Sequence, residues 1–220
     1  MKLKVIETSD GSKTLKIPAW NEHYHSTHGA IAEAKHVYIK NGLDFVQSED
    51  LSIFEMGFGT GLNAFLTYLN GLQNKRIINY YALENEPLPI ELVSQLDYVK
   101  SLNAVAEESI FYKFHTCSWN VVNDISSCFR LFKIHDAFED YIFKTSFDLV
   151  YYDAFGFRVQ PELWQKEVFE KLVKQINNGG VLVTYCAKGK VKRILKSFGM
   201  HVESLAGPPG KREMIRAIRL

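Results

Sequence analysis

Residues 53–63 constrain the fold of this chain more than any other stretch. They read Ile-Phe-Glu-Met-Gly-Phe-Gly-Thr-Gly-Leu-Asn, so an apolar run ends in an acidic residue and then meets three closely spaced glycines. Glycine lets a backbone turn sharply and approach a ligand closely. The pattern predicts a strand, a tight turn and the first turn of a helix, an arrangement that holds an adenosine cofactor.

The spacing of the glycines indicates which class of cofactor the loop can bind. Gly57, Gly59 and Gly61 give GxGxG, whereas dinucleotide-binding folds use GxGxxG. Glu55 stands just before them, and its carboxylate would repel a pyrophosphate but suit the cationic amino-acid end of S-adenosylmethionine. The loop therefore favours a methyltransferase over a nicotinamide dehydrogenase or a purely structural turn.

The rest of the chain alternates between strand and helix patterns. A hairpin is predicted over 2–17, and a helix near 28–40 within a segment that lies over or beside the cofactor pocket. Strands follow at 51–56, 78–84, 129–135, 147–153, 180–187, 201–207 and 213–220, and helices at 61–73, 88–101, 161–177 and 188–198. Residues 103–128 fit neither pattern clearly.

This alternation predicts an α/β fold of the Rossmann-like class I methyltransferase type. We expect a mostly parallel seven-stranded sheet with helices on both faces, an antiparallel pair of strands at the end of the chain, and an N-terminal β-hairpin extension. Residues 1–47 would form the hairpin and pocket-covering segment, and 48–220 the Rossmann-like domain, within one structural unit.

Composition excludes several classes of protein. Hydrophobic residues make up 46% of the chain, which is enough for a substantial core, but no apolar run is long enough to cross a membrane. The N-terminus lacks the apolar segment of a signal peptide. Three cysteines without a CxxC pair predict a reduced, cytoplasmic protein with neither a disulfide framework nor a zinc cluster.

Charge is unevenly distributed along the chain. Residues 186–220 carry nine Lys and Arg against two Glu, while residues 41–185 have a net charge of −8. A basic tail on an acidic body suggests a polyanionic partner such as nucleic acid, although a solvated helix face would look the same.

Acidic residues lie at or beside the carboxyl ends of four predicted strands, where a ligand of an open α/β sheet binds. Besides Glu55, Glu84 is expected to accept hydrogen bonds from ribose hydroxyls. Asp136 is expected to accept from the adenine amine, with Ala137 beside the ring. Asp153 follows the apolar run Leu-Val-Tyr-Tyr, so it is sheltered and is the candidate for catalysis or substrate orientation.

Aromatic, cysteine and histidine side chains near these strand ends are candidates for stacking, nucleophilic and metal-binding roles. Phe155, Phe157 and Trp164 could form a wall on which a base stacks. Cys186 lies in a predicted strand and is expected to pack there. No metal site is expected, because the histidines of the N-terminal segment have no obvious acidic partner: His23, His25, His28 and His36.

Seven stretches of the chain together resemble one family. They are YHSTHGAIAEAKHVYIKNGL (24–43), FEMGFGTGLNAF (54–65), LENEPL (83–88), DLVYYDAF (148–155), PELWQKEVFEKL (161–172), NGGVLVTYCAKGKVKRILKSFGM (178–200) and GPPGKREM (207–214). With these motifs the chain resembles the methyltransferase half of the MnmC proteins and, more closely, their stand-alone MnmD form.

The resemblance implies S-adenosylmethionine as methyl donor and the tRNA wobble uridine as substrate, with 5-methylaminomethyl-(2-thio)uridine as product. It places the cofactor contacts at Glu55, Gly57, Phe58, Gly59, Thr60, Gly61, Asn63, Glu84, Asp136, Ala137 and Asp153. It makes Asp153 the catalytic residue.

The same resemblance suggests where the tRNA anticodon stem-loop would lie. Tyr24 and His25 are expected to be lid or pocket residues, with His25 able to relay a proton, and Phe155 or Phe157 to stack on the wobble base. Anticodon phosphates are expected to contact the basic tail, at Lys188, Lys190, Lys192, Arg193, Lys211 and Arg212.

Two positions depart from the family pattern. His135 replaces a glycine that often precedes the adenine-side acid, and DAFGF replaces the DGFAP of bifunctional members. No flavin-dependent oxidase half is expected in these 220 residues, so another protein would have to make the aminomethyl precursor.

Three alternatives remain at this point. The chain could be a small-molecule amine methyltransferase or an aminopropyltransferase-like enzyme, which would not need the basic tail. It could instead be a non-catalytic RNA-binding protein on the same fold, but the retained glycines and strand-end acids argue against that.

Overall fold

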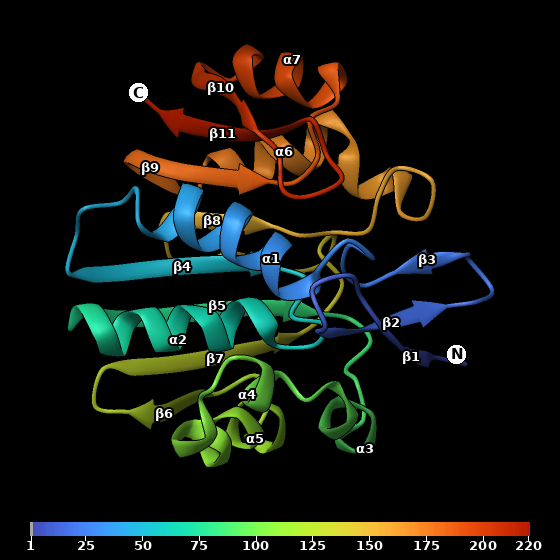
Figure 1. Cartoon of the computed structure of the whole chain (residues 1–220). Coiled ribbons are helices and arrows are strands. Elements are labelled where there is room, and N and C mark those ends of the chain that lie inside the picture. The colour runs from blue at the N-terminus through green and yellow to red at the C-terminus, as the bar shows by residue number, and fades with distance from the viewer. Residues whose placement is uncertain (1) are drawn as a thin grey trace.

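The computed structural model describes residues 2–220. Near the N-terminus the chain forms a small antiparallel sheet of β1 (Lys4–Glu7), β2 (Lys13–Ile17) and β3 (Glu22–His23). The predicted hairpin is confirmed, and β3 adds a third strand to it. Figure 1 shows this sheet beyond the carboxyl ends of the central strands of the main sheet.

The main sheet has eight strands in the order β10-β11-β9-β8-β4-β5-β7-β6. The five central strands, β9 to β7, run parallel, and β11 and β6 pair antiparallel at the two sides. The strands are β4 (Asp50–Met56), β5 (Ile77–Glu84), β6 (Val122–Ser126), β7 (Phe129–His135), β8 (Phe147–Tyr152), β9 (Ile176–Thr184), β10 (Met200–Ala206) and β11 (Glu213–Arg219).

Helices connect these strands and cover both faces of the sheet (Figure 1). On one face lie the N-terminal helices, α2 and the helices before β6, and on the other lie α6 and α7. The helices are α1 (Ala30–Ala34), η1 (Lys35–Leu43), α2 (Leu62–Asn74), α3 (Ile90–Val93), η2 (Ser94–Leu96), α4 (Tyr98–Ser101), η3 (Val105–Glu107), α5 (Glu108–Thr116), η4 (Pro161–Trp164), α6 (Lys166–Val173) and α7 (Gly189–Ser197).

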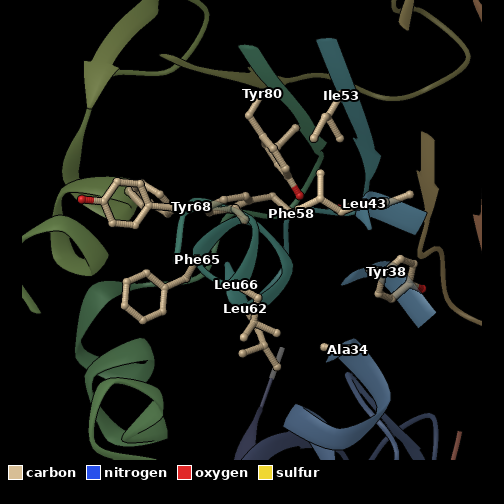
Figure 2. Close-up of a cluster of buried hydrophobic side chains, with 14 of the residues drawn as sticks. Ala34, Tyr38, Leu43, Ile53, Phe58, Leu62, Phe65, Leu66, Tyr68 and Tyr80 are labelled. Carbon is tan, nitrogen blue, oxygen red and sulfur yellow. The ribbon is translucent and has the colours of Figure 1, made fainter. Parts of the chain in front are cut away.

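The core is split by the sheet into two clusters, as the alternation of strand side chains requires. Along β4, Ile53 packs with the α2 side and Phe54 with the α6 side. Figure 2 shows part of the first cluster, which includes Leu62 and Phe65 of α2, Tyr38 of η1 and Tyr80 of β5. Burying a side chain of this size contributes about 1.5–3 kcal/mol, so the core fixes the strand order and aligns the strand ends.

The fold class is confirmed, with local differences from the predicted elements. The ambiguous segment contains α5 and the extra strand β6, which makes the sheet eight-stranded. The predicted helix over 88–101 is divided into short turns, because Asp97 adopts a left-handed conformation with φ 54°. The predicted helix over 161–177 ends at Val173.

Strand β9 begins four residues earlier than predicted. Gly179 has φ 77°, and the pairing of β9 with β8 shifts register between Phe147 and Leu149. A glycine in this conformation allows a bulge, so the Asn-Asn-Gly-Gly stretch belongs to the strand rather than to a turn. The division of the chain at residue 47 stays a prediction.

Candidate active site

A cavity of about 270 Å³ opens at the carboxyl ends of β4, β5 and β8. We call it the first cavity. Its wall contains the glycine loop and the side chains of Tyr24 and His25 from the N-terminal segment. It carries five acidic residues and, among the described residues, neither Lys nor Arg: Glu84, Glu86, Glu139, Asp153 and Glu162. Such a wall favours a cationic or hydroxyl-rich ligand and disfavours a pyrophosphate.

The glycine loop wraps over the end of β5. The backbone N–H groups of Gly57 and Phe58 both donate to the carbonyl of Leu83, at 3.0 and 3.1 Å. Gly59 and Gly61 have φ of 49° and 71°, a region that disfavours other residues. A Cβ on Gly59 would also lie 3.3 Å from the Tyr24 ring. The loop therefore depends on glycine for both conformation and space.

Glu84 joins the loop to the end of β5. Its carboxylate accepts from the N–H of Gly59 at 2.8 Å and from the N–H of Glu86 at 2.9 Å. Burial raises the pKa of Glu84, and these backbone donors partly oppose that rise. Each carboxylate oxygen keeps a second lone pair that can accept from a ligand hydroxyl.

Asp153 follows β8, and its carboxylate accepts hydrogen bonds from one side chain of η1 and one of α2. Tyr38 Oη donates to Oδ1 at 2.6 Å, and Asn63 Nδ2 donates to Oδ2 at 2.9 Å. Burial raises the pKa of Asp153 to about 7, against the lowering effect of the Tyr38 hydrogen bond. The carboxylate is thus fixed in orientation and poised to exchange a proton near neutral pH.

A second cavity, of about 220 Å³, adjoins the first. The two share five wall residues, which are Tyr24, His25, Asp153, Ala154 and Phe155. The second cavity adds Glu33, Tyr185 and Lys211. Asp153 therefore faces two neighbouring spaces, as a group acting between two reactants would.

Glu55 does not line either cavity. It is completely buried, and its two oxygens have no hydrogen-bond partner among residues 2–220. Burial, followed by the negative charge of Asp153, raises the pKa of Glu55 well above its usual range. Its side chain points into the sheet face that Ile53 also occupies, and the predicted contact between Glu55 and a cofactor cation stays a prediction.

Asp136 and Ala137 also lie outside the cavity walls. Asp136 Oδ1 accepts from the N–H of Ala137 at 2.9 Å, so the carboxylate stabilises its own turn. Phe138 and Glu139 reach the first cavity instead. The predicted contacts of Asp136 and Ala137 with adenine stay predictions.

The two predicted stacking residues have different surroundings. Phe155 lines both cavities and makes edge contacts with Trp20 and Tyr24, at centroid distances of 6.0 and 5.1 Å. Phe157 lies outside the cavities and stacks on Trp164 at 4.9 Å, with the ammonium of Lys188 4.2 Å from its ring. Only Phe155 is placed to face a ligand beside Asp153.

The N-terminal segment contributes Tyr24 and His25 to both cavities, as predicted for pocket residues. The His25 ring lies 3.3 Å from the Thr14 hydroxyl and is buried. Burial lowers the pKa of His25 to about 4, so its imidazole is neutral at physiological pH. Arg158 fastens the turn before β3 by donating to the Asn21 carbonyl at 3.0 Å.

The predicted phosphate-binding residues divide into two groups. Four are exposed at α7 and the β10–β11 loop: Lys188, Lys190, Arg193 and Arg212. The other two are ion-paired: Lys192 with Glu213 at 2.7 Å, and Lys211 with Glu33 at 2.6 Å. Lys211 thus belongs to the second cavity rather than to an exposed phosphate-binding surface.

Sequence reasoning missed the wall residues Trp20, Glu33 and Tyr185, and it missed Tyr38, the buried partner of Asp153. Tyr38 reaches Asp153 from the π-helical segment η1, whose wider turns cannot be predicted from the sequence pattern.

The four N-terminal histidines are dispersed, and no group of three or more His, Cys, Asp or Glu in the described chain could hold a metal ion. Within the same residues no helix is long and apolar enough to span a membrane.

Comparison with known proteins agrees with this geometry. Residues 122–219 match a family described as S-adenosyl-L-methionine-dependent methyltransferase. The cofactor class predicted from the glycine loop and the expectation of a methyltransferase are thereby confirmed.

The curated relatives are bifunctional MnmC proteins named for tRNA 5-methylaminomethyl-2-thiouridine biosynthesis. The one from Burkholderia multivorans is 28% identical over 219 residues, and the one from Campylobacter fetus is 28% identical over 210 residues. The alignments cover 92% and 90% of this chain but 33% of each relative. This methyltransferase therefore spans about a third of the length of these relatives.

Solved structures show the same fold. The crystal structure of MNMC2 from Aquifex aeolicus matches with a TM-score of 0.73 at 22% identity, covering 98% of this chain and 69% of that one. Spermidine synthase from Thermotoga maritima matches with a TM-score of 0.58 at 12% identity, covering 99% and 68%. At these identities the likeness concerns fold alone.

Proposed function

We propose that this methyltransferase transfers a methyl group to the primary amine of 5-aminomethyl-(2-thio)uridine at the wobble position of tRNA, giving 5-methylaminomethyl-(2-thio)uridine. The observation that carries the proposal is the position of Asp153 in the wall between the two cavities. The names of the MnmC relatives supply the nucleoside.

The first cavity is the proposed cofactor site. Its acidic wall suits the positive charges of S-adenosylmethionine, and Glu84 has free lone pairs for the ribose hydroxyls. The glycine loop allows close backbone approach. When bound, S-adenosylmethionine supplies a methyl group on a positively charged sulfur.

Asp153 is proposed to act on the acceptor amine. A new N–C bond forms as the bond between sulfur and methyl carbon breaks, the sulfur keeps that electron pair, and the nitrogen must lose a proton. Asp153 can accept an N–H hydrogen bond that orients the lone pair, and can then take the proton. Tyr38 and Asn63 fix the carboxylate for this purpose.

The acceptor must be neutral before it can react. A primary alkylamine with a Lys-like pKa is almost fully protonated at pH 7, and deprotonating it costs roughly 4 kcal/mol. A dry pocket lowers the pKa of an amine because it disfavours the charged form. The aromatic wall of Tyr24 and Phe155 is proposed to provide this environment.

The raised pKa of Asp153 predicts that kcat/KM decreases on the acid side of the pH profile. Because the carboxyl is ionised only above about pH 7, kcat/KM should fall about tenfold per pH unit below that value. Tyr38→Phe removes a hydrogen bond that lowers this pKa, so this decrease should move to higher pH. Tyr68→Phe is the matched control, because the Tyr68 hydroxyl likewise donates to a carboxylate, that of Glu107 at 2.7 Å, and lies outside both cavities. An unchanged profile in Tyr38→Phe would contradict the assignment.

The exposed cations around α7 are proposed to contact tRNA phosphates. The double variant with Lys188→Gln and Arg193→Gln should weaken tRNA binding about tenfold and reduce the salt slope by about two. Cofactor affinity should not change. Lys144→Gln is the control, because Lys144 is an exposed residue at the amino end of β8. Equal salt slopes for all three proteins would exclude this surface as the tRNA site.

A small-amine methyltransferase or aminopropyltransferase-like enzyme is the second candidate. The likeness to the spermidine synthase fold and the acidic cavities are compatible with a polyamine substrate. Parallel assays with labelled S-adenosylmethionine, using either tRNA that lacks the modification or a set of polyamines, separate the two. Methyl transfer to polyamines alone would overturn the tRNA proposal.

A further inference from the structure

An ion pair lines the second cavity. Glu33 of α1 and Lys211 of the β10–β11 loop approach to 2.6 Å, and their side chains are 8% and 33% exposed. A largely buried ion pair loses hydration and is a weak source of stability, so its presence in a cavity wall requires another explanation.

Both members of the pair keep hydrogen-bonding capacity. One Glu33 oxygen accepts from Lys211, and the other accepts from the N–H of Ser26 at 2.7 Å. Each carboxylate oxygen can accept a second bond, and the ammonium has three donors. The Lys211 ammonium also lies 3.7 Å from the centroid of the Tyr185 ring, which holds it in place. The wall therefore presents an acceptor directly beside a donor.

We propose that the second cavity binds the pyrimidine ring of the acceptor nucleotide and that this pair reads its imide edge. Glu33 accepts the N3–H, and Lys211 donates to the adjacent carbonyl or thiocarbonyl. An N–H next to a C=O is the complement of this acceptor–donor pair. The inference rests on the proposed function, because it assumes a uridine-type acceptor.

The other walls of the second cavity fit the same ring. Tyr24 and Phe155 offer aromatic surfaces, and a base stacked on an aromatic side chain gains about 1–3 kcal/mol. Asp153 lies in the same wall, so a substituent on the ring can reach it. Glu33 and Lys211 do not line the first cavity, which separates base recognition from cofactor binding.

The first test changes the substrate and leaves the protein intact. An anticodon stem-loop RNA with 5-aminomethyluridine at the wobble position is compared with the same RNA methylated at N3 of that base. N3-methylation removes the donor that Glu33 accepts and puts a methyl group against its carboxylate, so kcat/KM should fall about 10- to 100-fold. In Glu33→Ala, which lacks the acceptor, the two RNAs should react at nearly equal rates.

The second test removes the donor. Lys211→Met should lower kcat/KM for the unmethylated RNA about 10- to 100-fold, with unchanged binding of S-adenosylmethionine measured by calorimetry. Lys13→Met is the matched control, because Lys13 pairs with Asp97 at a similar exposure of 34% and lies outside both cavities. It should retain wild-type kinetics.

The outcomes separate this inference from the proposed function. If the wild-type protein methylates no aminomethyluridine RNA, the proposed function fails. If it methylates the RNA but tolerates N3-methylation, or if Lys211→Met is as active as Lys13→Met, the proposed function stands and the reading of the imide edge is overturned.

Discussion

Asp153→Asn is expected to reduce the rate of methyl transfer by about 10²- to 10⁴-fold, the usual contribution of a positioned acid–base group. Asparagine has nearly the same shape, but its amide cannot take a proton from the amine. In the wild-type protein, Tyr38 and Asn63 each donate a hydrogen bond to one carboxylate oxygen of Asp153. The side-chain Nδ2 of the new asparagine is itself a donor, so it would face one of these two donors. The loss should appear in single-turnover rates at saturating S-adenosylmethionine.

The control for this variant is Asp148→Asn. Asp148 lies at the amino end of the same strand, β8, and accepts from the N–H of Ser52 at 2.9 Å. It should lose some stability and little activity. If Asp153→Asn retained more than about a tenth of the wild-type rate, Asp153 could not be the proton acceptor.

Asp153→Asn should also change how the stability of the protein depends on pH. The pKa of Asp153 is raised from the ordinary 3.8 to about 7 on folding, so its contribution to stability is present below pH 4 and is lost as the pH rises through 7. That loss amounts to at most about 4 kcal/mol. Asp153→Asn should therefore be relatively more stable at pH 8 than at pH 4, in urea melts compared with wild type.

Glu84→Ala is expected to weaken the binding of S-adenosylmethionine about 10- to 100-fold. The change removes the acceptor for ribose hydroxyls, since hydrogen bonds to a charged group contribute about 1.5–3 kcal/mol. It also leaves the N–H of Gly59 without its partner at the apex of the glycine loop. The Kd from calorimetry should rise, while the rate at saturating cofactor should change little, because Glu84 does not contact Asp153.

Glu91→Ala is the control for Glu84→Ala. Glu91 lies in α3 shortly after the same strand and does not line the first cavity. S-adenosylhomocysteine, which has the same ribose but no sulfonium, should lose affinity for Glu84→Ala by the same factor. A loss confined to S-adenosylmethionine would indicate that Glu84 interacts with the cation and not with the ribose.

The parts of the site that follow directly from strand ends could be predicted from sequence. Gly59 and Asp153 follow buried strands and Glu84 ends one, and parallel strands bring their carboxyl ends to one edge. Glu55 shows the limit of this reasoning. It precedes the strand end by one residue, and side chains alternate along a strand, so it turns into the core while the loop after it faces the cavity.

Partners supplied by distant segments could not be predicted. Tyr38 reaches Asp153 across 115 positions in the chain, and Lys211 reaches Glu33 across 178. Neither contact leaves a periodic pattern, because each depends on how η1 and the β10–β11 loop pack on the sheet. Charge counting along the tail could not separate exposed Arg193 from Lys211, which is paired with Glu33.

The central claim is that the chain methylates the wobble aminomethyl group of tRNA, and one measurement tests it most directly. The purified protein is incubated with labelled S-adenosylmethionine and bulk tRNA that lacks the modification, and the digested nucleosides are identified by mass spectrometry. The account predicts label in 5-methylaminomethyl-(2-thio)uridine with wild-type protein and none with Asp153→Ala. Label in another nucleoside, or equal label with both proteins, would contradict it.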